Sequence, residues 1–222
     1  VIKAAFECSV KKVIALSTDK AVNPINLYGA TKLVSEKLFI SANNIYGDKP
    51  TRFSVVRYGN VIGSRGSVVD VFKKLINQNA QHFPITDKRM TRFWMTLSQS
   101  VKLVLNSIEL MRGGETYIPK IPSIKITDLA KVMSNNKKIK VIGIRPGEKI
   151  NELLCASSAA HLTLEFDDHY VVIPSTSKNI SYSSYKKNKL GKIGKAVISE
   201  FEYSSEKNKN FLSLQDIKKS IN

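Results

Sequence analysis

The chain has 222 residues, of which 42% are hydrophobic and 24% are charged, and its formal net charge is +17 at pH 7. This is the composition of a globular protein with enough length for one large core, or for a large domain and a small one. No run of about 18 apolar residues occurs, and no charged segment followed by an apolar stretch opens the chain, so neither a transmembrane helix nor a signal peptide is expected.

The first part of the chain alternates between strand and helix patterns. A short apolar run over residues 12–17 predicts a buried strand, and Asn23-Pro24 marks the loop after it. Apolar residues recur at helical spacing over 28–45, and a second apolar run over 52–57 predicts the next strand. Such alternation is typical of βαβ units, so we predict an α/β fold with a parallel sheet.

The rest of the chain is less regular. Gly59, Gly63 and Gly66 punctuate a predicted loop, and Thr127 is expected to cap a short helix. From about residue 175 the sequence is polar and weakly periodic, which predicts an extended or partly ordered tail. The other predicted elements are helices over 68–79, 97–111, 127–133 and 214–221, a strand over 140–144 and a turn over 145–147.

The strong positive charge bears on the choice of partner. Such a charge often indicates nucleic acid or a membrane surface. Here the basic residues are spread along the chain without an aromatic-interleaved stripe, so neither partner is predicted, and the positive field suits an anionic small-molecule substrate. The two cysteines, Cys8 and Cys155, are isolated, which predicts a reducing cytoplasm rather than a disulfide scaffold.

Tyr28 and Lys32 are the first catalytic candidates. Their four-residue spacing puts them on one helix face. A lysine ammonium favours the tyrosine phenolate, which can take a proton from a sugar hydroxyl while a hydride leaves the same carbon. The spacing alone is weak, because it occurs twice more in the polar tail. Placement at the start of a helix, after a strand that ends in Ser-Thr, favours this pair.

Asp19 and Lys20 are a second candidate pair. An adjacent Asp-Lys is usually a solvated loop pair. This one follows a predicted parallel strand, and open α/β sheets bind their ligands at the carboxyl ends of the strands. One carboxyl and one amine can serve as acid and base in an elimination, and burial in a cleft can shift the pKa of each toward neutral pH.

Several ordered motifs carry a family resemblance. Residues 16–32, Leu-Ser-Thr-Asp-Lys-Ala-Val-Asn-Pro-Ile-Asn-Leu-Tyr-Gly-Ala-Thr-Lys, closely resemble the inverting UDP-N-acetylglucosamine 4,6-dehydratases that begin pseudaminic acid synthesis, which are extended short-chain dehydrogenase/reductases. The similarity continues through residues 53–68, 85–94 and 144–149. It covers about residues 12–174, with a looser match at 201–205.

This resemblance implies a redox-neutral dehydration of UDP-N-acetylglucosamine with NADP as the cofactor. Tyr28, helped by Lys32 and Thr18, would oxidise the sugar at C4 by hydride transfer to the cofactor. Lys20 would then remove the C5 proton, which the 4-ketone makes acidic, and Asp19 would protonate the departing C6 hydroxyl. Hydride would return to C6, and C5 would be reprotonated on the opposite face, giving a sugar for surface glycan or flagellin.

The resemblance also implies binding residues and an oligomer. Tyr28, Lys32 and Val61 would contact NADP, and the complete enzyme would be a homo-oligomer. Arginine suits a UDP pyrophosphate, because it supplies planar, permanently charged donors. No metal is predicted, because the three histidines lack ligand-like spacing. The implied contacts to the UDP-sugar substrate are Asn60, Arg65, Gly66, Ser67, Val68, Arg92, Arg145 and Glu148.

The glycine-rich phosphate loop of such enzymes is not found in the chain. No Gly-x-Gly-x-x-Gly occurs, so we expect that the N-terminal dinucleotide-binding half is missing and that NADP binds weakly. Residues 1–60 would then be the C-terminal part of a Rossmann-like parallel sheet, to which later segments can return. Residues 61–174 would form a smaller α/β substrate-binding region, and residues 175–222 a polar C-terminal extension.

Two kinds of alternative function stay open. A retaining 4,6-dehydratase or a 4-epimerase belongs to the same superfamily. An epimerase needs the tyrosine and lysine but no acid–base pair for elimination, so Asp19 and Lys20 favour a dehydratase. A non-catalytic basic binding module is the alternative from another class, and its affinity for nucleic acid would depend strongly on salt.

Overall fold

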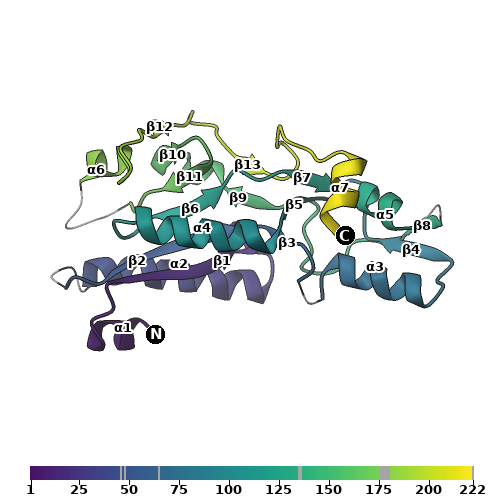
Figure 1. The fold of residues 1–222 in the computed structure, drawn as a ribbon, viewed down its shortest axis with the longest axis horizontal. Helices are drawn as coiled ribbons and strands as arrows, with labels where there is room; N and C mark the ends of the chain where they lie inside the picture. The colour runs from purple at the N-terminus through teal and green to yellow at the C-terminus, as the bar shows by residue number, and fades with distance from the viewer. Residues whose placement is uncertain (46, 48, 65, 135–136, 176–180, 222) are drawn as a thin grey trace. The chain divides into compact units, whose positions relative to one another are not determined.

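The chain folds into two compact units, each assembled from three separate segments (Figure 1). The computed structural model describes residues 1–45, 47, 49–64, 66–134, 137–175 and 181–221. The first unit comprises Val1–Tyr58, Val101–Lys120 and Leu153–Glu202, and the second comprises Gly59–Ser100, Ile121–Glu152 and Tyr203–Asn222. The chain therefore passes repeatedly between the units, and segments after residue 60 return to the first one.

Within the described residues, the first unit is built on a six-stranded sheet of mixed direction. Its strands in spatial order are β1 (Lys12–Thr18), β2 (Arg52–Tyr58), β6 (Thr116–Pro119), β11 (His169–Val172), β10 (Thr163–Glu165) and β12 (Lys195–Ala196). β1, β2 and β6 are parallel, and the last three strands follow in antiparallel order. The predicted α/β fold with a parallel sheet is thus confirmed, with an antiparallel extension.

Helices cover both faces of this sheet. Phe53 of β2 shares a buried cluster with Ala42 of α2 (Leu27–Ile45), whereas Val56 shares one with Leu110 of α4 (Leu97–Leu110). Side chains alternate along a strand, so α2 and α4 pack on opposite faces of β2. No helix within the described ranges is long and apolar enough to cross a membrane. The remaining elements of the unit are α1 (Ile2–Glu7), η1 (Asp19–Ala21), β9 (Leu153–Cys155), η2 (Ser157–Leu162) and α6 (Tyr182–Lys186).

Two asparagines fix the ends of α2. The Asn26 side-chain oxygen accepts the Gly29 N–H at 2.8 Å, which is the hydrogen bond of a helix N-cap. At the other end, the Asn43 amide pairs with both backbone groups of Phe53, at 3.0 and 2.9 Å. The helix is thereby tied to β2 where that strand begins.

The second unit holds its own core. Two small sheets contribute to it, together with three helices, and Phe83, Ile124, Leu129 and Ile217 are fully buried there. Trp94 also belongs to this core. The elements are β3 (Asn60–Val61), β5 (Thr91–Met95) and β7 (Ser123–Lys125) in one sheet, β4 (His82–Ile85) and β8 (Lys138–Val141) in the other, β13 (Tyr203–Ser204), α3 (Val68–Asn77), α5 (Ile126–Ser134) and α7 (Leu214–Ile221).

Two boundary predictions in this unit were wrong. Thr127 lies inside α5 rather than at its N-cap, because β7 runs directly into the helix and the Ile126 N–H is bound by the Met90 carbonyl at 3.0 Å. The strand predicted over 140–144 occupies Lys138–Val141 instead. Its range is set by its partner, since residues 138–141 pair one by one with the four residues of β4.

The prediction of a loosely ordered tail was wrong for residues 203–213, while the predicted last helix is confirmed as α7. The Tyr203 hydroxyl donates to the Ile121 carbonyl at 2.9 Å and accepts the Ile121 N–H at 3.0 Å. The Asn208 side chain donates to the same carbonyl, and Ile217 is fully buried. These anchors are single residues between polar stretches, so they leave no periodic pattern in the sequence.

Candidate active site

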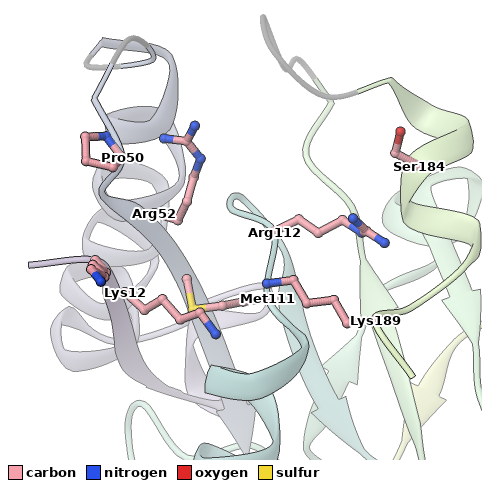
Figure 2. Close-up of a pocket in the computed structure, with 8 residues that line it drawn as sticks. Lys12, Pro50, Arg52, Met111, Arg112, Ser184 and Lys189 are labelled. Atoms are coloured by element: carbon pink, nitrogen blue, oxygen red, sulfur yellow. The ribbon is translucent and has the colours of Figure 1, made fainter. Parts of the chain in front are cut away.

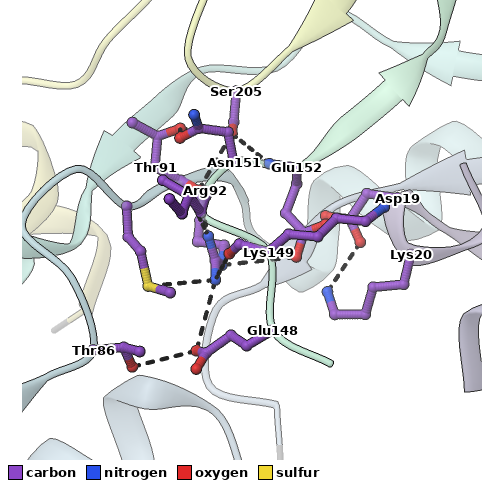
Figure 3. Close-up of polar contacts among 12 residues, drawn as sticks. Asp19, Lys20, Thr86, Thr91, Arg92, Glu148, Lys149, Asn151, Glu152 and Ser205 are labelled. Atoms are coloured by element: carbon purple, nitrogen blue, oxygen red, sulfur yellow. Dashed lines mark hydrogen bonds and ion pairs between the residues drawn. The ribbon is translucent and has the colours of Figure 1, made fainter. Parts of the chain in front are cut away.

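The Asp19–Lys20 pair lies directly after β1, in the short helix η1. Asp19 is fully buried, and its Oδ1 accepts a hydrogen bond from the Thr18 hydroxyl at 2.9 Å. The same oxygen accepts a hydrogen bond from Lys20 Nζ at 3.0 Å (Figure 3). The Lys20 side chain stays 34% exposed. A buried carboxyl and a partly accessible amine are therefore held in hydrogen-bond contact at the carboxyl end of a parallel strand.

Two buried oxygens at this strand end have no hydrogen-bond partner among the described residues. They are Asp19 Oδ2 and the hydroxyl of Ser17. A buried polar atom without a partner costs roughly 1–3 kcal/mol, so native proteins keep few of them and often keep them at functional sites. These two oxygens at the end of β1 can accept hydrogen bonds from a polar ligand.

Gly29 brings the start of α2 against this turn. A Cβ at position 29 would lie 2.2 Å from the Lys20 carbonyl oxygen and 3.0 Å from Pro24 Cβ. Only glycine permits this approach of two backbones. The packing fixes Tyr28, the preceding residue, beside the turn that carries Asp19 and Lys20.

Tyr28 and Lys32 lie on the first turns of α2. The Tyr28 side chain is exposed, and Lys32 Nζ donates to the Leu16 carbonyl of β1 at 2.8 Å. Burial raises the pKa of Tyr58, and the nearby Tyr28 phenol raises it further. The sequence reasoning missed Tyr58; its signal is the register, because it pairs with Thr18 at the ends of two parallel strands.

A buried ion pair supports this end of the sheet and was also missed. The Arg57 guanidinium binds both oxygens of Glu36, with Nη2–Oε2 at 2.6 Å and Nε–Oε1 at 3.0 Å. A third bond runs from Nη1 to the Leu154 carbonyl at 2.8 Å. The pair ties α2 to β2, one residue before Tyr58.

The first unit contains all five predicted catalytic residues, at the end of β1, in η1 and on the first turns of α2. They are Thr18, Asp19, Lys20, Tyr28 and Lys32.

The predicted substrate residues that the structure describes lie in the second unit. Arg92 is buried there, and its guanidinium donates to the carbonyls of Thr91, Lys149 and Ile150 at 2.7–2.9 Å (Figure 3). Two of these bonds hold the backbone of Lys149 and Ile150, the residues that follow Glu148. Arg92 therefore shapes the loop that carries two other predicted residues.

Glu148 joins the two predicted arginines. Its carboxylate lies 3.8 Å from Arg92 Nη2 and 3.5 Å from Arg145 Nε, and it accepts a hydrogen bond from Thr86. The Arg145 side chain is 70% exposed. The structure thus groups Arg92, Arg145 and Glu148, with the Arg145 guanidinium accessible to a ligand.

The remaining predicted residues fall in and after β3. Asn60 and Val61 form β3 beside Trp94 and Met95 of β5, and Asn60 Oδ1 is buried without a partner in the described part of the chain. Ser67 caps α3, and Val68 is its first residue. The Gly66 N–H donates to Asp70, and its φ of 73° suits glycine. Arg65 lies outside the described residues. No group of three or more His, Cys, Asp or Glu residues that could hold a metal occurs within the described ranges.

The family follows from a match over most of the chain. A family model described as polysaccharide biosynthesis protein matches residues 1–174. The chain belongs to this family. It is 55% identical over 222 residues, its whole length, to the inverting UDP-N-acetylglucosamine 4,6-dehydratase of Campylobacter jejuni strain 81-176, and it spans 66% of that protein.

Two further comparisons concern this polysaccharide biosynthesis protein. It is 38% identical over 225 residues to the UDP-glucose 4-epimerase of Rickettsia bellii strain OSU 85-389, with 100% of this chain and 64% of the relative covered. The chain superposes on the X-ray structure of Pen from Bacillus thuringiensis with a TM-score of 0.84 at 37% sequence identity. The match covers 100% of this chain and 64% of the Pen chain. The chain therefore spans just under two thirds of the length of these relatives.

Proposed function

We propose that this polysaccharide biosynthesis protein dehydrates UDP-N-acetylglucosamine to a 4-keto-6-deoxy sugar with inversion at C5, using NADP, in surface glycan synthesis. The observation that carries the proposal is the Asp19–Lys20 contact at the end of β1, next to the helix turn with Tyr28 and Lys32. The 55% identity to a protein named for this reaction supports the choice of substrate.

Tyr28 acts at the C4 hydroxyl. Its phenol is exposed, and in this proposal its oxygen accepts the C4 proton, with Lys32 one helical turn away on the same face. The chemistry that a bound nicotinamide supplies is reversible hydride exchange. Tyr28, Lys32 and Val61 are the proposed contacts, and the exposed phenol and neighbouring amine suit the ribose end of such a cofactor.

Lys20 and Asp19 carry out the elimination. The Lys20 amine takes the C5 proton, which the C4 ketone has made acidic. As the C6–O bond breaks, Asp19 gives its proton to the leaving hydroxyl, so that one water is lost. The Thr18 hydroxyl holds the Asp19 carboxyl in place through the 2.9 Å bond. The hydride removed from C4 returns to C6, and reprotonation of C5 from the opposite face gives the inverted product.

The second unit supplies the proposed contacts to the UDP-sugar. Arg145 offers the accessible guanidinium for a pyrophosphate, and Arg92 acts mainly by positioning Glu148. Asn60 offers its unpartnered amide oxygen to a hydroxyl group. The other proposed contacts are Arg65, Gly66, Ser67 and Val68.

Hydrogen–deuterium exchange at C5 tests the assignment of the base. Turnover in deuterated water is followed by NMR for Lys20→Ala and Asp19→Asn in the chain joined to a glycine-rich dinucleotide-binding half, with the exposed α2 residue Lys37→Ala as the control. General acid–base groups contribute about 100- to 10,000-fold, so both site variants should lose turnover on that scale. Lys20→Ala should show little C5 exchange, whereas Asp19→Asn should retain some. Normal dehydration by Lys20→Ala would show that the base is another residue.

A 4-epimerase is the second candidate, because the Rickettsia bellii relative at 38% identity carries that name. Epimerisation would use Tyr28 and Lys32 and leave the Asp19–Lys20 pair without a chemical role. NMR of the product separates the two reactions: an epimer keeps its C6 hydroxyl, whereas a dehydration product carries a 6-methyl group.

We also propose a cytoplasmic homo-oligomer. α2 exposes Leu27, Val34, Leu38 and Ile45 at spacings of seven, four and seven, which place them along one helix face. Such a stripe suits a second copy of the chain. Cys8 and Cys155 are both free thiols, which fits a reducing compartment. Neither nucleic acid nor a membrane is part of the proposal.

A further inference from the structure

A basic pocket of about 570 Å³ opens in the first unit, where β1 and β2 begin and where the chain approaches β6 (Figure 2). Of the described residues that line it, five are cations and none is a carboxylate. The cations come from four separate stretches of the sequence. They are Lys11, Lys12, Arg52, Arg112 and Lys189.

This pocket is separate from the candidate active site. Lys12 is the first residue of β1 and Thr18 is the last, and six steps of about 3.3 Å place them about 20 Å apart. Arg52 and Tyr58 bear the same relation along β2. The pocket therefore lies at the amino ends of these strands, and the proposed catalytic residues lie at their carboxyl ends.

Backbone carbonyls hold three of the cations. Lys12 Nζ donates to the Ile108 carbonyl at 2.6 Å, Arg112 Nη2 to the Lys187 carbonyl at 2.9 Å and Arg52 Nη1 to the Thr51 carbonyl at 3.0 Å. A carbonyl carries no net charge, so these bonds position the side chains without neutralising them. Figure 2 shows the Lys12 and Lys189 side chains reaching toward one another across the pocket.

The neighbouring cations affect the pKa of Lys189. Partial burial lowers the pKa of its amine, and the charges of Lys12 and Arg112 lower it further. Glu115 and Glu109 oppose this shift with smaller effects. A group that lies among like charges is relieved when an anion binds between them.

We propose that this pocket binds a small ligand with a diphosphate or triphosphate group. Guanidinium and ammonium groups that line one pocket from several segments can bind several phosphate oxygens at once. The volume lies within the roughly 300–1,000 Å³ typical of small-ligand pockets. Met111 and Pro50 add apolar surface, on which a nucleoside attached to the phosphates can rest. The site is independent of the proposed dehydration.

Calorimetric titration with inorganic pyrophosphate tests this proposal. Lys189→Gln and Arg112→Gln each remove one charge-assisted hydrogen bond, so each should weaken binding about ten-fold or more. Lys37→Gln is the matched surface control, and Arg145→Gln tests for binding at the candidate substrate site. Lys37→Gln should bind within about two-fold of the parent chain. A loss in Arg145→Gln would report a second site, and Lys189→Gln should still weaken pyrophosphate binding in that background.

Lysine footprinting provides a second, site-resolved measurement. Lys189 is exposed and has a lowered pKa, so an acylating reagent should modify it quickly, and pyrophosphate should slow that reaction selectively. ADP in place of pyrophosphate separates the two sources: stronger protection by ADP indicates a nucleotide, and equal protection indicates the phosphates alone.

Three results would overturn the proposal. The first is an absence of pyrophosphate binding by the parent chain. The second is weaker binding in Arg145→Gln with normal binding in Lys189→Gln, which would place the anion at the candidate substrate site. The third is tighter protection of Lys189 by a single-stranded oligonucleotide than by pyrophosphate or ADP, which would assign the pocket to nucleic acid.

Discussion

The substitution Gly29→Ala tests how α2 positions the candidate active site. The added Cβ would lie 2.2 Å from the Lys20 carbonyl oxygen, so the two backbones must separate by about 1 Å to restore an ordinary contact. Overpacking of this kind costs about 1–3 kcal/mol, and the gain in helix propensity offsets up to about 1 kcal/mol. The free energy of unfolding should fall by about 1–2 kcal/mol. This corresponds to a decrease in Tm of about 2–8 °C.

The effect on turnover should be larger than the effect on stability. A misplacement of about 1 Å can cost about 100-fold in rate, and Lys20 is the residue displaced. Tm is measured by calorimetry and kcat by NMR of the sugar product. Lys37→Ala, an exposed change on the same helix, should leave both values unaltered. An unchanged Tm and an unchanged kcat in Gly29→Ala would refute the reasoning, and a lower Tm with normal kcat would show that Lys20 needs no such placement.

Three further substitutions probe the first unit. Glu36→Gln leaves the Arg57 charge without its partner, which costs about 3–5 kcal/mol of the free energy of unfolding. Calorimetry should therefore show a Tm lowered by about 10 °C. A decrease under about 2 °C would contradict the buried ion pair. Burial, with the charge of Glu165, raises the pKa of Tyr170 to about 12, so its contribution to stability is complete below about pH 10 and is lost as pH rises toward 12. The free energy of unfolding, measured by denaturant titration, should therefore fall less steeply between pH 10 and pH 12 in Tyr170→Phe than in the parent chain. An equal pH dependence in both proteins would disprove the assignment. Leu38→Glu should dissociate the proposed oligomer in light scattering, with Lys37→Glu as the control, and a monomeric parent chain would end that proposal.

The sequence by itself determined the elements at the heart of the first unit. β1 and β2 show in the sequence as apolar runs and α2 as a helical period, so the α/β fold could be predicted from residues 12–57. The prediction that the first strand is buried was wrong: β1 is the first strand of the described sheet, most of its side chains are only partly buried, and Leu16 is 49% exposed. The catalytic candidates could be found for a similar reason. Thr18 to Lys32 form one strand–turn–helix segment, and proximity along the chain there becomes proximity in space.

Only the tertiary structure decided which distant residues meet. Tyr58 lies beside Thr18 because two parallel strands end in register, and Arg57 meets Glu36 because α2 packs on β2. The basic pocket gathers cations from four separate stretches of the sequence, and the tail is anchored by single residues such as Tyr203. Such contacts depend on strand order, register and chain reversal. A local period carries no information about these, because it reports only which side of an element is buried.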